Sequence, residues 1–289
     1  MRILMVVLFS LGLVSRALGD DTTFDNPIVD LVAKPVIVTS NHPLGLAAKW
    51  VVGERAVVVP VLGANQSPHH AALTARQRLA LDTADLIIWL GAESEPAFAG
   101  AIAQMRAPVL EFPAGELAGD NDLHRWLSPH LLKSLGEQLE QHLGMVAESG
   151  WQERLAQTVT GVERKLAALP RFRYVVQHDA LRYFTDAFRL PPAIALRDSH
   201  GQAAGAKARQ TIEAGARGAS CLLVETGGHA HDVEVVAERF RLPMVEVDIT
   251  GRNLALTETS YDQLLNNLAD AFTRCANGSS EGVTATISE

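Results

Sequence analysis

Strand and helix patterns alternate in two blocks along the chain, and one uninterrupted helical stretch separates the two blocks. In the first block, short apolar segments typical of buried strands are followed by helical segments; two such strand segments are KPVIVTS and ADLIIWLG. The second block repeats this order from FRYVVQH onward. Alternation of this kind predicts mostly parallel sheets flanked by helices, and two blocks predict two α/β lobes.

The separating stretch runs from Ser149 to Leu169 and contains no helix breaker before Pro170. About twenty helical residues span about 30 Å, which is the breadth of a small domain. We therefore expect one long rigid helix to join the lobes. The expected parts are a signal peptide over 1–19, a first lobe over 20–147, a linking helix over 148–170, a second lobe over 171–276 and a disordered tail over 277–289.

The first nineteen residues have the organisation of a secretory signal. A basic residue, Arg2, precedes an apolar run from Ile3 to Val14, and the small residues Ala17 and Gly19 follow at a cleavage site. The run is too short to cross a bilayer; the alternative is a buried N-terminal strand or helix. No later segment is apolar for long enough to span a membrane. We therefore expect the mature protein to be soluble and exported.

The charge and the cysteine content indicate which partners and which disulfide to expect. The formal net charge is −8 and no basic stripe occurs, so we expect no nucleic-acid partner. The two cysteines are Cys221 and Cys275. Disulfides persist in an exported protein, which favours a single bridge over a pair of free buried thiols.

Three histidines follow predicted strands at points where ligands bind in α/β proteins. His69 comes after the second strand and before a helix predicted to start at Thr74, where Gln77 completes a capping box. His124 follows the fourth strand, and His178 is expected as the last residue of the strand FRYVVQH. The carboxyl ends of parallel strands meet at one edge of a sheet, so each lobe offers imidazoles at the same edge.

Carboxylates occupy the corresponding positions in the second lobe. Asp248 ends the strand PMVEVDI, and Glu225 ends the strand ASCLLVE. Three imidazoles and one carboxylate form a tetrahedral nitrogen and oxygen set that suits zinc. The sequence therefore predicts a Zn²⁺ site in the cleft between the lobes, built from His69, His124, His178 and one of the two carboxylates.

The other histidines are not expected to be ligands of the main zinc site. His42 is expected to line the cleft without binding, and His200 to lie near its mouth. A weak accessory site is the alternative to no function for His229 and His231 in GGHAHD. The remaining ones are expected to point away from the metal or into solvent: His70, His130 and His142.

Several motifs resemble the zinc-binding proteins of bacterial ABC importers, the ZnuA-like group. They occur in order along nearly all of the mature chain as GANQSPHHAALTARQ, DLHRWLSP, VVQHDALRYF, SCLLVE and LTETSYDQLLNNLADAFTRC. The resemblance implies two lobes bridged by a long helix, a metal at their interface and delivery to a membrane permease. It also implies that His69, His124 and His178 are ligands, and that Cys221 and Cys275 form a disulfide between the third strand of the second lobe and the last helix.

The fourth ligand and the metal also follow from the resemblance. Asp248 matches an aspartate that many members use, with Glu225 or water as alternatives, whereas Pro68 stands where some members carry a glutamate. Manganese-binding relatives typically carry a glutamate at the position of His178, so the histidine favours zinc. The chain departs from many zinc members in one respect, because AGELAGDND is short and lacks the histidines of their metal-rich loop.

The expected function is zinc capture in the periplasm and delivery to an ABC permease by a monomeric, non-catalytic protein. Four protein ligands close a zinc site, whereas a catalytic zinc keeps one position open for water. The alternatives are a metallochaperone for another acceptor, an adhesin of the same fold and a secreted zinc hydrolase with Glu225 as base. The hydrolase is the weakest of these, since the sequence contains no HExxH helix.

Overall fold

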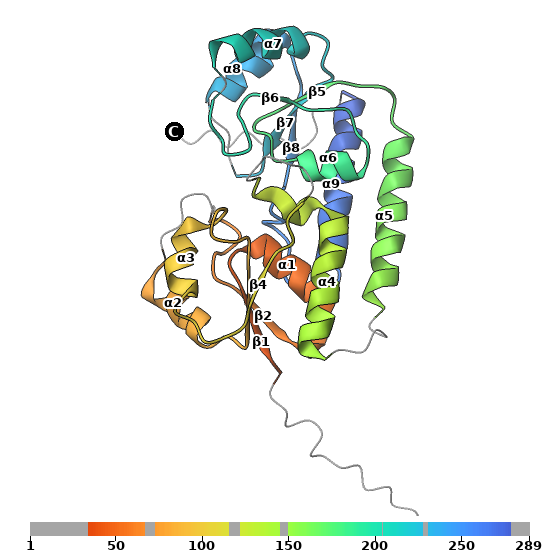
Figure 1. Cartoon of the computed structure of the whole chain (residues 1–289). Helices are drawn as coiled ribbons and strands as arrows, with labels where there is room; N and C mark the ends of the chain where they lie inside the picture. Colours follow the sequence, from red (N-terminus) through yellow and green to blue (C-terminus); the bar gives the residue numbers. More distant parts are fainter. Residues whose placement is uncertain are drawn as a thin grey trace, which may run out of the picture. The chain divides into compact units, whose positions relative to one another are not determined.

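The computed structural model describes residues 34–66, 73–115, 122–144, 150–203, 205–227 and 231–278, without the side chains of residues 206–209 (Figure 1). The predicted signal peptide, most of the predicted tail, and His69, His70 and His229 lie outside the described residues. Within the described ranges, no helix combines the length and the apolar character needed to cross a membrane.

Four parallel strands form the first sheet, in the order β2-β1-β3-β4. The strands are β1 (Val36–Thr39), β2 (Val57–Pro60), β3 (Leu86–Trp89) and β4 (Val109–Glu111), connected through α1 (His42–Val52), α2 (Ala75–Asp82) and α3 (Pro96–Ile102). All four residues of β3 are buried. A parallel strand covered on both faces is apolar along its whole length, which explains the continuous LIIW run.

The second sheet repeats the first. Its order is β6-β5-β7-β8, again with all neighbours parallel. The strands are β5 (Tyr174–Val176), β6 (Ile194–Ala195), β7 (Cys221–Glu225) and β8 (Met244–Val247), and the helices are α6 (Arg182–Ala187), α7 (Ala206–Ala216), α8 (His231–Phe240) and α9 (Ser260–Ala276). The predicted α/β class with two parallel sheets flanked by helices is confirmed.

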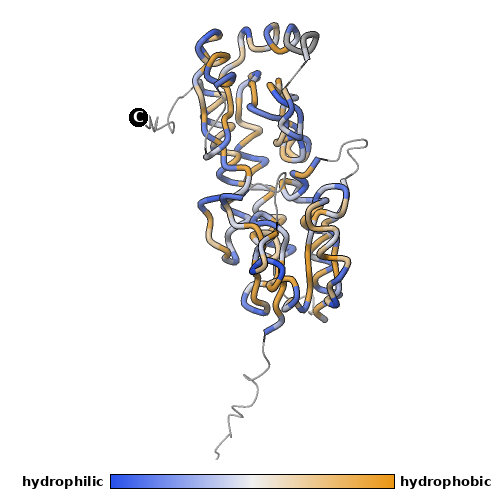
Figure 2. Tube along the Cα trace, turned by 90° about the vertical axis from the view of Figure 1, so that its left-hand side faces the viewer, coloured by the Kyte–Doolittle hydropathy of each residue, from blue (hydrophilic) through white to orange (hydrophobic). Residues whose placement is uncertain are grey.

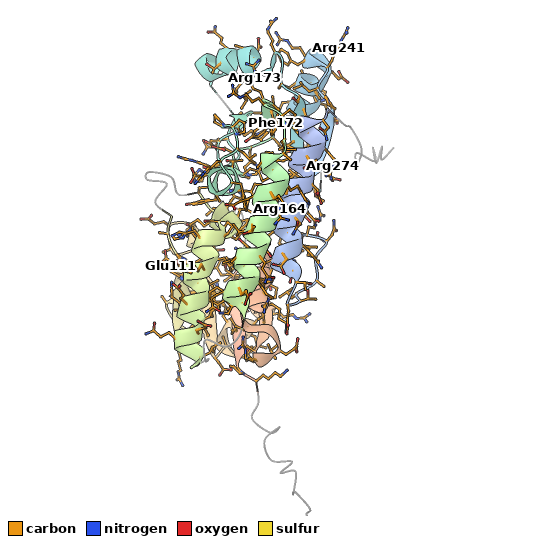
Figure 3. The ribbon with its side chains drawn as sticks, turned by 90° about the vertical axis from the view of Figure 1, so that its right-hand side faces the viewer. Glu111, Arg164, Phe172, Arg173, Arg241 and Arg274 are labelled. Atoms are coloured by element: carbon orange, nitrogen blue, oxygen red, sulfur yellow. A yellow bond between two sulfur atoms is a disulfide. The ribbon has the colours of Figure 1, made fainter. Side chains whose placement is uncertain are left out.

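Three long helices run beside one another along one side of the molecule (Figure 3). They are α4 (Pro129–Leu143), α5 (Trp151–Ala167) and α9, and α5 falls inside the stretch predicted as one unbroken helix. The Thr158 hydroxyl donates to Asp262 Oδ1 at 2.7 Å, and Lys165 Nζ lies 2.6 Å from Asp270 Oδ1. These contacts fix α5 along the length of α9.

Helix α9 buries one face. Its buried residues recur at spacings of three and four, the period of a helix packed on a core: Tyr261, Leu264, Leu265, Leu268 and Phe272. Hydrophilic and hydrophobic residues alternate along the tube in Figure 2. One core cluster contains Ile37 and Trp50 from the first lobe together with Tyr174 and Phe272 from the second. The apolar interior is therefore continuous between the two sheets.

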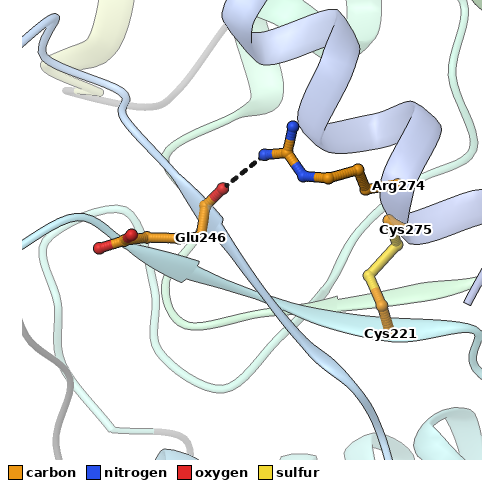
Figure 4. The surroundings of a disulfide bond; sticks show 4 residues. All are labelled: Cys221, Glu246, Arg274 and Cys275. Atoms are coloured by element: carbon orange, nitrogen blue, oxygen red, sulfur yellow. Dashed lines mark hydrogen bonds between the residues drawn. A yellow bond between two sulfur atoms is a disulfide. The ribbon is translucent and has the colours of Figure 1, made fainter. Parts of the chain in front are cut away.

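Cys221 and Cys275 form a disulfide, as predicted (Figure 4). Cys221 opens β7, a central strand of the second sheet, and Cys275 lies in the last turn of α9; their Cα atoms are 5.2 Å apart. Arg274 adds a hydrogen bond from its guanidinium to the backbone oxygen of Glu246 in β8, at 3.3 Å. The end of α9 is thus fastened to two neighbouring strands.

The predicted capping box at the start of α2 is present. Gln77 N–H donates to the Thr74 hydroxyl at 3.3 Å, and Thr74 N–H donates to Gln77 Oε1 at 2.9 Å. These reciprocal bonds satisfy two amides that a helix start otherwise leaves open, so the local sequence fixes where α2 begins.

Candidate metal centre

His124 lies in a 3₁₀ helix, η4 (His124–Leu127), between β4 and α4. The sequence pattern does not predict this turn, because four residues are too few to show a helical period. Asp122 Oδ1 accepts hydrogen bonds from the His124 backbone N–H at 2.9 Å and from the ring Nδ1 at 2.7 Å. Both side chains are buried. Asp122 therefore sets the start of the turn and the orientation of the His124 ring.

Arg125 anchors η4 to the first sheet. Its guanidinium donates to the carbonyl oxygens of Leu90 and Phe112, the residues that directly follow β3 and β4. It also donates to the Ser94 hydroxyl at 3.2 Å. The turn is consequently held at the carboxyl edge of the sheet, where the sequence places His124.

Glu95 is another buried charged group at this edge. Its carboxylate accepts from the Leu90 N–H at 2.8 Å and from the Asn41 side-chain amide at 3.1 Å. Burial raises the pKa of Glu95 above its ordinary value, while these hydrogen bonds and the charge of Arg125 oppose the rise. The edge of the first sheet is therefore cross-linked by buried polar contacts, which gives η4 a fixed base.

His178 contributes the second ring from the other lobe. The expectation that it ends a strand is wrong, because β5 ends at Val176. Gln177 N–H still donates to the Leu223 oxygen of β7 at 3.0 Å. Asp179 N–H donates instead to the backbone oxygen of Arg197 at 3.1 Å, which is not part of β7. His178 therefore lies just beyond the sheet, next to Glu225.

Glu225 ends β7, as predicted. Its carboxylate Oε1 accepts a hydrogen bond from His178 Nδ1, and its backbone N–H donates to the Gln177 side-chain oxygen at 3.1 Å. β5 and β7 are neighbouring central strands between which the strand order reverses. Open parallel sheets bind ligands at such a reversal point, outside the carboxyl ends of the strands.

The two rings meet across the lobes. His124 Nε2 lies 3.3 Å from His178 Nε2, and the ring centroids are 5.0 Å apart. Each Nδ1 is bonded to a carboxylate, Asp122 or Glu225, which can only accept a hydrogen bond. In the neutral state, each ring therefore presents its Nε2 lone pair toward the other ring. A cation beside both nitrogens would accept a coordinate bond from each lone pair.

The separation fits a tetrahedral ion. Two nitrogens bound at about 2.05 Å to one tetrahedral zinc are about 3.3 Å apart, which matches the separation between the His124 and His178 nitrogens. Ligating histidines usually donate their other ring N–H to a carboxylate or carbonyl, which holds the ring and raises its basicity. Both features of a metal-binding histidine pair are thus present.

The other two predicted ligands are not part of this pair in the described structure. His69 falls in residues 67–72, outside the described ranges. The expectation that Asp248 ends a strand is wrong, because β8 ends at Val247. The Asp248 carboxylate accepts from the backbone N–H groups of Thr250, Arg252 and Asn253 and from the Thr250 hydroxyl. Within the described ranges no group of three or more His, Cys, Asp or Glu side chains is spaced to hold a metal.

The other described histidines lie apart from the pair. His42 is buried, and its Nε2 lies 3.1 Å from the Gly251 oxygen and 3.2 Å from the Leu254 oxygen. The side chain of His231 is 85% exposed and contacts Glu234. The remaining ones are exposed: His130, His142 and His200. His42 therefore connects the lobes through backbone carbonyls.

The chain matches the family model described as ZnuA, "Zinc-uptake complex component A periplasmic", over residues 37–275. The chain belongs to this family. Both paired histidines and their carboxylate partners lie within the matched range. The matched range runs from β1 to the last turn of α9 and so contains strands of both sheets.

Curated relatives resemble this chain in sequence, and solved structures share its fold. The high-affinity zinc uptake system protein ZnuA of Haemophilus ducreyi is 24% identical over 297 residues, covering 86% of this chain and 95% of the relative. A zinc-bound ZnuA deletion mutant has a TM-score of 0.71 at 18% identity and covers 87% of this chain and 100% of that chain. FpvC of Pseudomonas aeruginosa in complex with Mn²⁺ has a TM-score of 0.68 at 19% identity. The match covers 85% of this chain and 99% of FpvC. The shared fold thus occurs in proteins solved with different metals.

Asp122 and Trp126 contact His124 directly, and reasoning from the sequence misses both residues. Asp122 carries a usable signal, since a carboxylate two residues before a histidine can cap the turn and reach the ring. Trp126 stacks edge-on against His124, with 5.2 Å between the ring centroids, and sequence spacing alone gives no sign of this contact.

Proposed function

We propose that this protein captures Zn²⁺ in the periplasm and delivers it to the permease of an ABC importer. The observation that supports this most strongly is the pair of Nε2 atoms of His124 and His178, 3.3 Å apart, each on a ring held by a carboxylate. Membership of the zinc-uptake family supports the same function.

The ligand chemistry favours zinc over manganese. Imidazole suits zinc, copper and nickel, whereas carboxylate, carbonyl and water oxygens suit manganese and magnesium. His124 and His178 present nitrogens, while Asp122 and Glu225 are engaged with the Nδ1 atoms of those rings. The proposed cargo is therefore zinc.

The proposed site contains His69, His124, His178 and Asp248, with Glu225 as a partner of His178. Four protein ligands fill a tetrahedral shell and leave no position for a reactive water, as in a binding protein rather than a hydrolase. Asp248 Oδ2 accepts from the Asn253 N–H at 3.3 Å and has a second lone pair, so Oδ2 is the oxygen proposed to bind zinc. Glu225 or water is the alternative fourth ligand.

The proposed exported form begins after a signal peptide over residues 1–19. It consists of lobes over 20–147 and 171–276, the linking helix over 148–170 and a tail over 277–289. In this proposal the monomer presents both lobes to the permease and surrenders the ion there.

Deleting the gene in its own bacterium tests zinc delivery. The deletion strain should stop growing at a zinc-chelator concentration that the parent tolerates, because high-affinity capture is lost. Added zinc, but not manganese, should restore growth, and so should the gene supplied on a plasmid. A deletion strain as tolerant as its parent, or one rescued by manganese alone, would contradict the proposal.

A further inference from the structure

Three consecutive residues of η4 contact three different parts of the molecule. His124 faces His178 of the second lobe, and Arg125 donates to backbone carbonyls at the edge of the first sheet. Trp126 extends to the loop between β8 and α9, residues 248–259. The position of the His124 ring therefore depends on how its neighbours are held.

Trp126 is fixed at three points. Its indole Nε1 donates to the Ile249 oxygen at 2.9 Å, and its own backbone oxygen accepts from the Tyr261 hydroxyl at 2.8 Å. Its ring packs edge-on against His124, with an interplanar angle of 65°. Trp126 and Tyr261 are both almost completely buried. Burial raises the pKa of Tyr261, so its hydroxyl stays protonated and remains a donor.

The partner of the indole lies beside a proposed ligand. Ile249 directly follows Asp248, whose carboxylate accepts three backbone N–H groups and one hydroxyl from the same loop. This loop is therefore stiff at the point where Trp126 is attached. Because Trp126 lies two residues from His124, the indole hydrogen bond fixes the distance between η4 and the second-lobe side of the site.

We propose that Trp126 and Tyr261 are positioning residues for the metal site, which hold His124 at coordinating distance from the second-lobe ligands. This inference rests on the proposed function, since it concerns the geometry of zinc binding. A tetrahedral ion requires its ligand atoms within a few tenths of an ångström of fixed places. Without the indole N–H, η4 loses its tie to Ile249, and the separation of the two rings is held by fewer contacts.

Two conservative replacements test this inference. Trp126→Phe removes the indole N–H, and Tyr261→Phe removes the hydroxyl, while both keep an aromatic ring in the core. Each should raise the zinc dissociation constant about five- to tenfold, the size of one lost hydrogen bond. Combined, they should raise it by less than the product of the single effects, because both act through η4.

The chain offers a matched control for each replacement. Trp151 is also fully buried and donates through Nε1 to Glu140 Oε1 at 2.8 Å. Tyr174 is buried and donates through its hydroxyl to the Pro191 oxygen at 2.6 Å. Trp151→Phe and Tyr174→Phe should lower the melting temperature but leave the zinc dissociation constant within about twofold of the reference value.

Cobalt provides a readout that reports geometry rather than stability. The visible absorption spectrum of Co²⁺-loaded protein should change in Trp126→Phe and Tyr261→Phe and stay unchanged in both controls. Unaltered zinc affinity and cobalt spectrum in the two site variants, or equal losses in the controls, would overturn the inference. If the unmodified protein binds neither zinc nor cobalt, the proposed function itself is wrong. Failure of the inference and failure of the proposed function therefore give different results.

Discussion

Replacing His178 with alanine should raise the zinc dissociation constant at least about a hundredfold while the protein remains folded. The ring supplies one of two nitrogens that face each other at 3.3 Å across the lobes. Loss of an outer partner of a metal-binding histidine already costs about 10–100-fold, so loss of the ligand itself costs more. The measurement is a competition titration with a coloured chelator, using metal-stripped protein whose reference form binds one zinc.

His231→Ala is the matched control for that variant. The His231 side chain is 85% exposed and lies 3.3 Å from Glu234, far from the paired rings, so its removal should leave the zinc affinity and the stoichiometry of one unchanged. A His178→Ala protein with the affinity of the reference would refute histidine ligation at this position. Weak extra binding that disappears in His231→Ala would reveal an accessory site.

Removing the disulfide should lower stability by about 4 kcal/mol without changing zinc stoichiometry. The bridge joins residues 54 positions apart, and the chain-entropy model gives this magnitude for a loop of that length. Cys221→Ala with Cys275→Ala is the suitable double variant, because both positions are fully buried and a serine hydroxyl would add a desolvation cost. The melting temperature should fall by roughly 10 °C.

The reduced reference protein controls for the side-chain replacement. It should melt close to the double variant, because both lack the covalent constraint on the unfolded chain and differ only by the two buried sulfur atoms. Unchanged melting on reduction would show that the bridge does not stabilise the fold. Loss of zinc binding in a folded double variant would show that the disulfide supports the site as well as α9.

Local sequence patterns predict much of the fold because burial and helix capping depend on neighbouring residues. The apolar run of β3, the Thr74 capping box and the apolar period of α9 each depend on residues close in sequence. The two cysteines fall where a central strand and the last helix meet, so the expected pairing is confirmed.

The geometry of the site depends on contacts between residues far apart in the sequence. Local patterns do not predict such contacts. His124 and His178 are 54 residues apart, and their separation depends on η4 and on the loop after β5. Asp122 and Glu225 each orient a ring through its Nδ1. Asp248 shows the limit most clearly, since it follows β8 instead of ending it, and its carboxylate caps its own loop.

X-ray absorption by zinc-loaded protein tests the central claim most directly, because it reports the atoms bound to the ion. The account predicts one zinc per chain, with imidazole nitrogens at about 2.0–2.1 Å that include those of His124 and His178. The imidazole contribution should decrease in His124→Ala and in His178→Ala. A zinc shell without imidazole, or one identical in the reference and both variants, would contradict it.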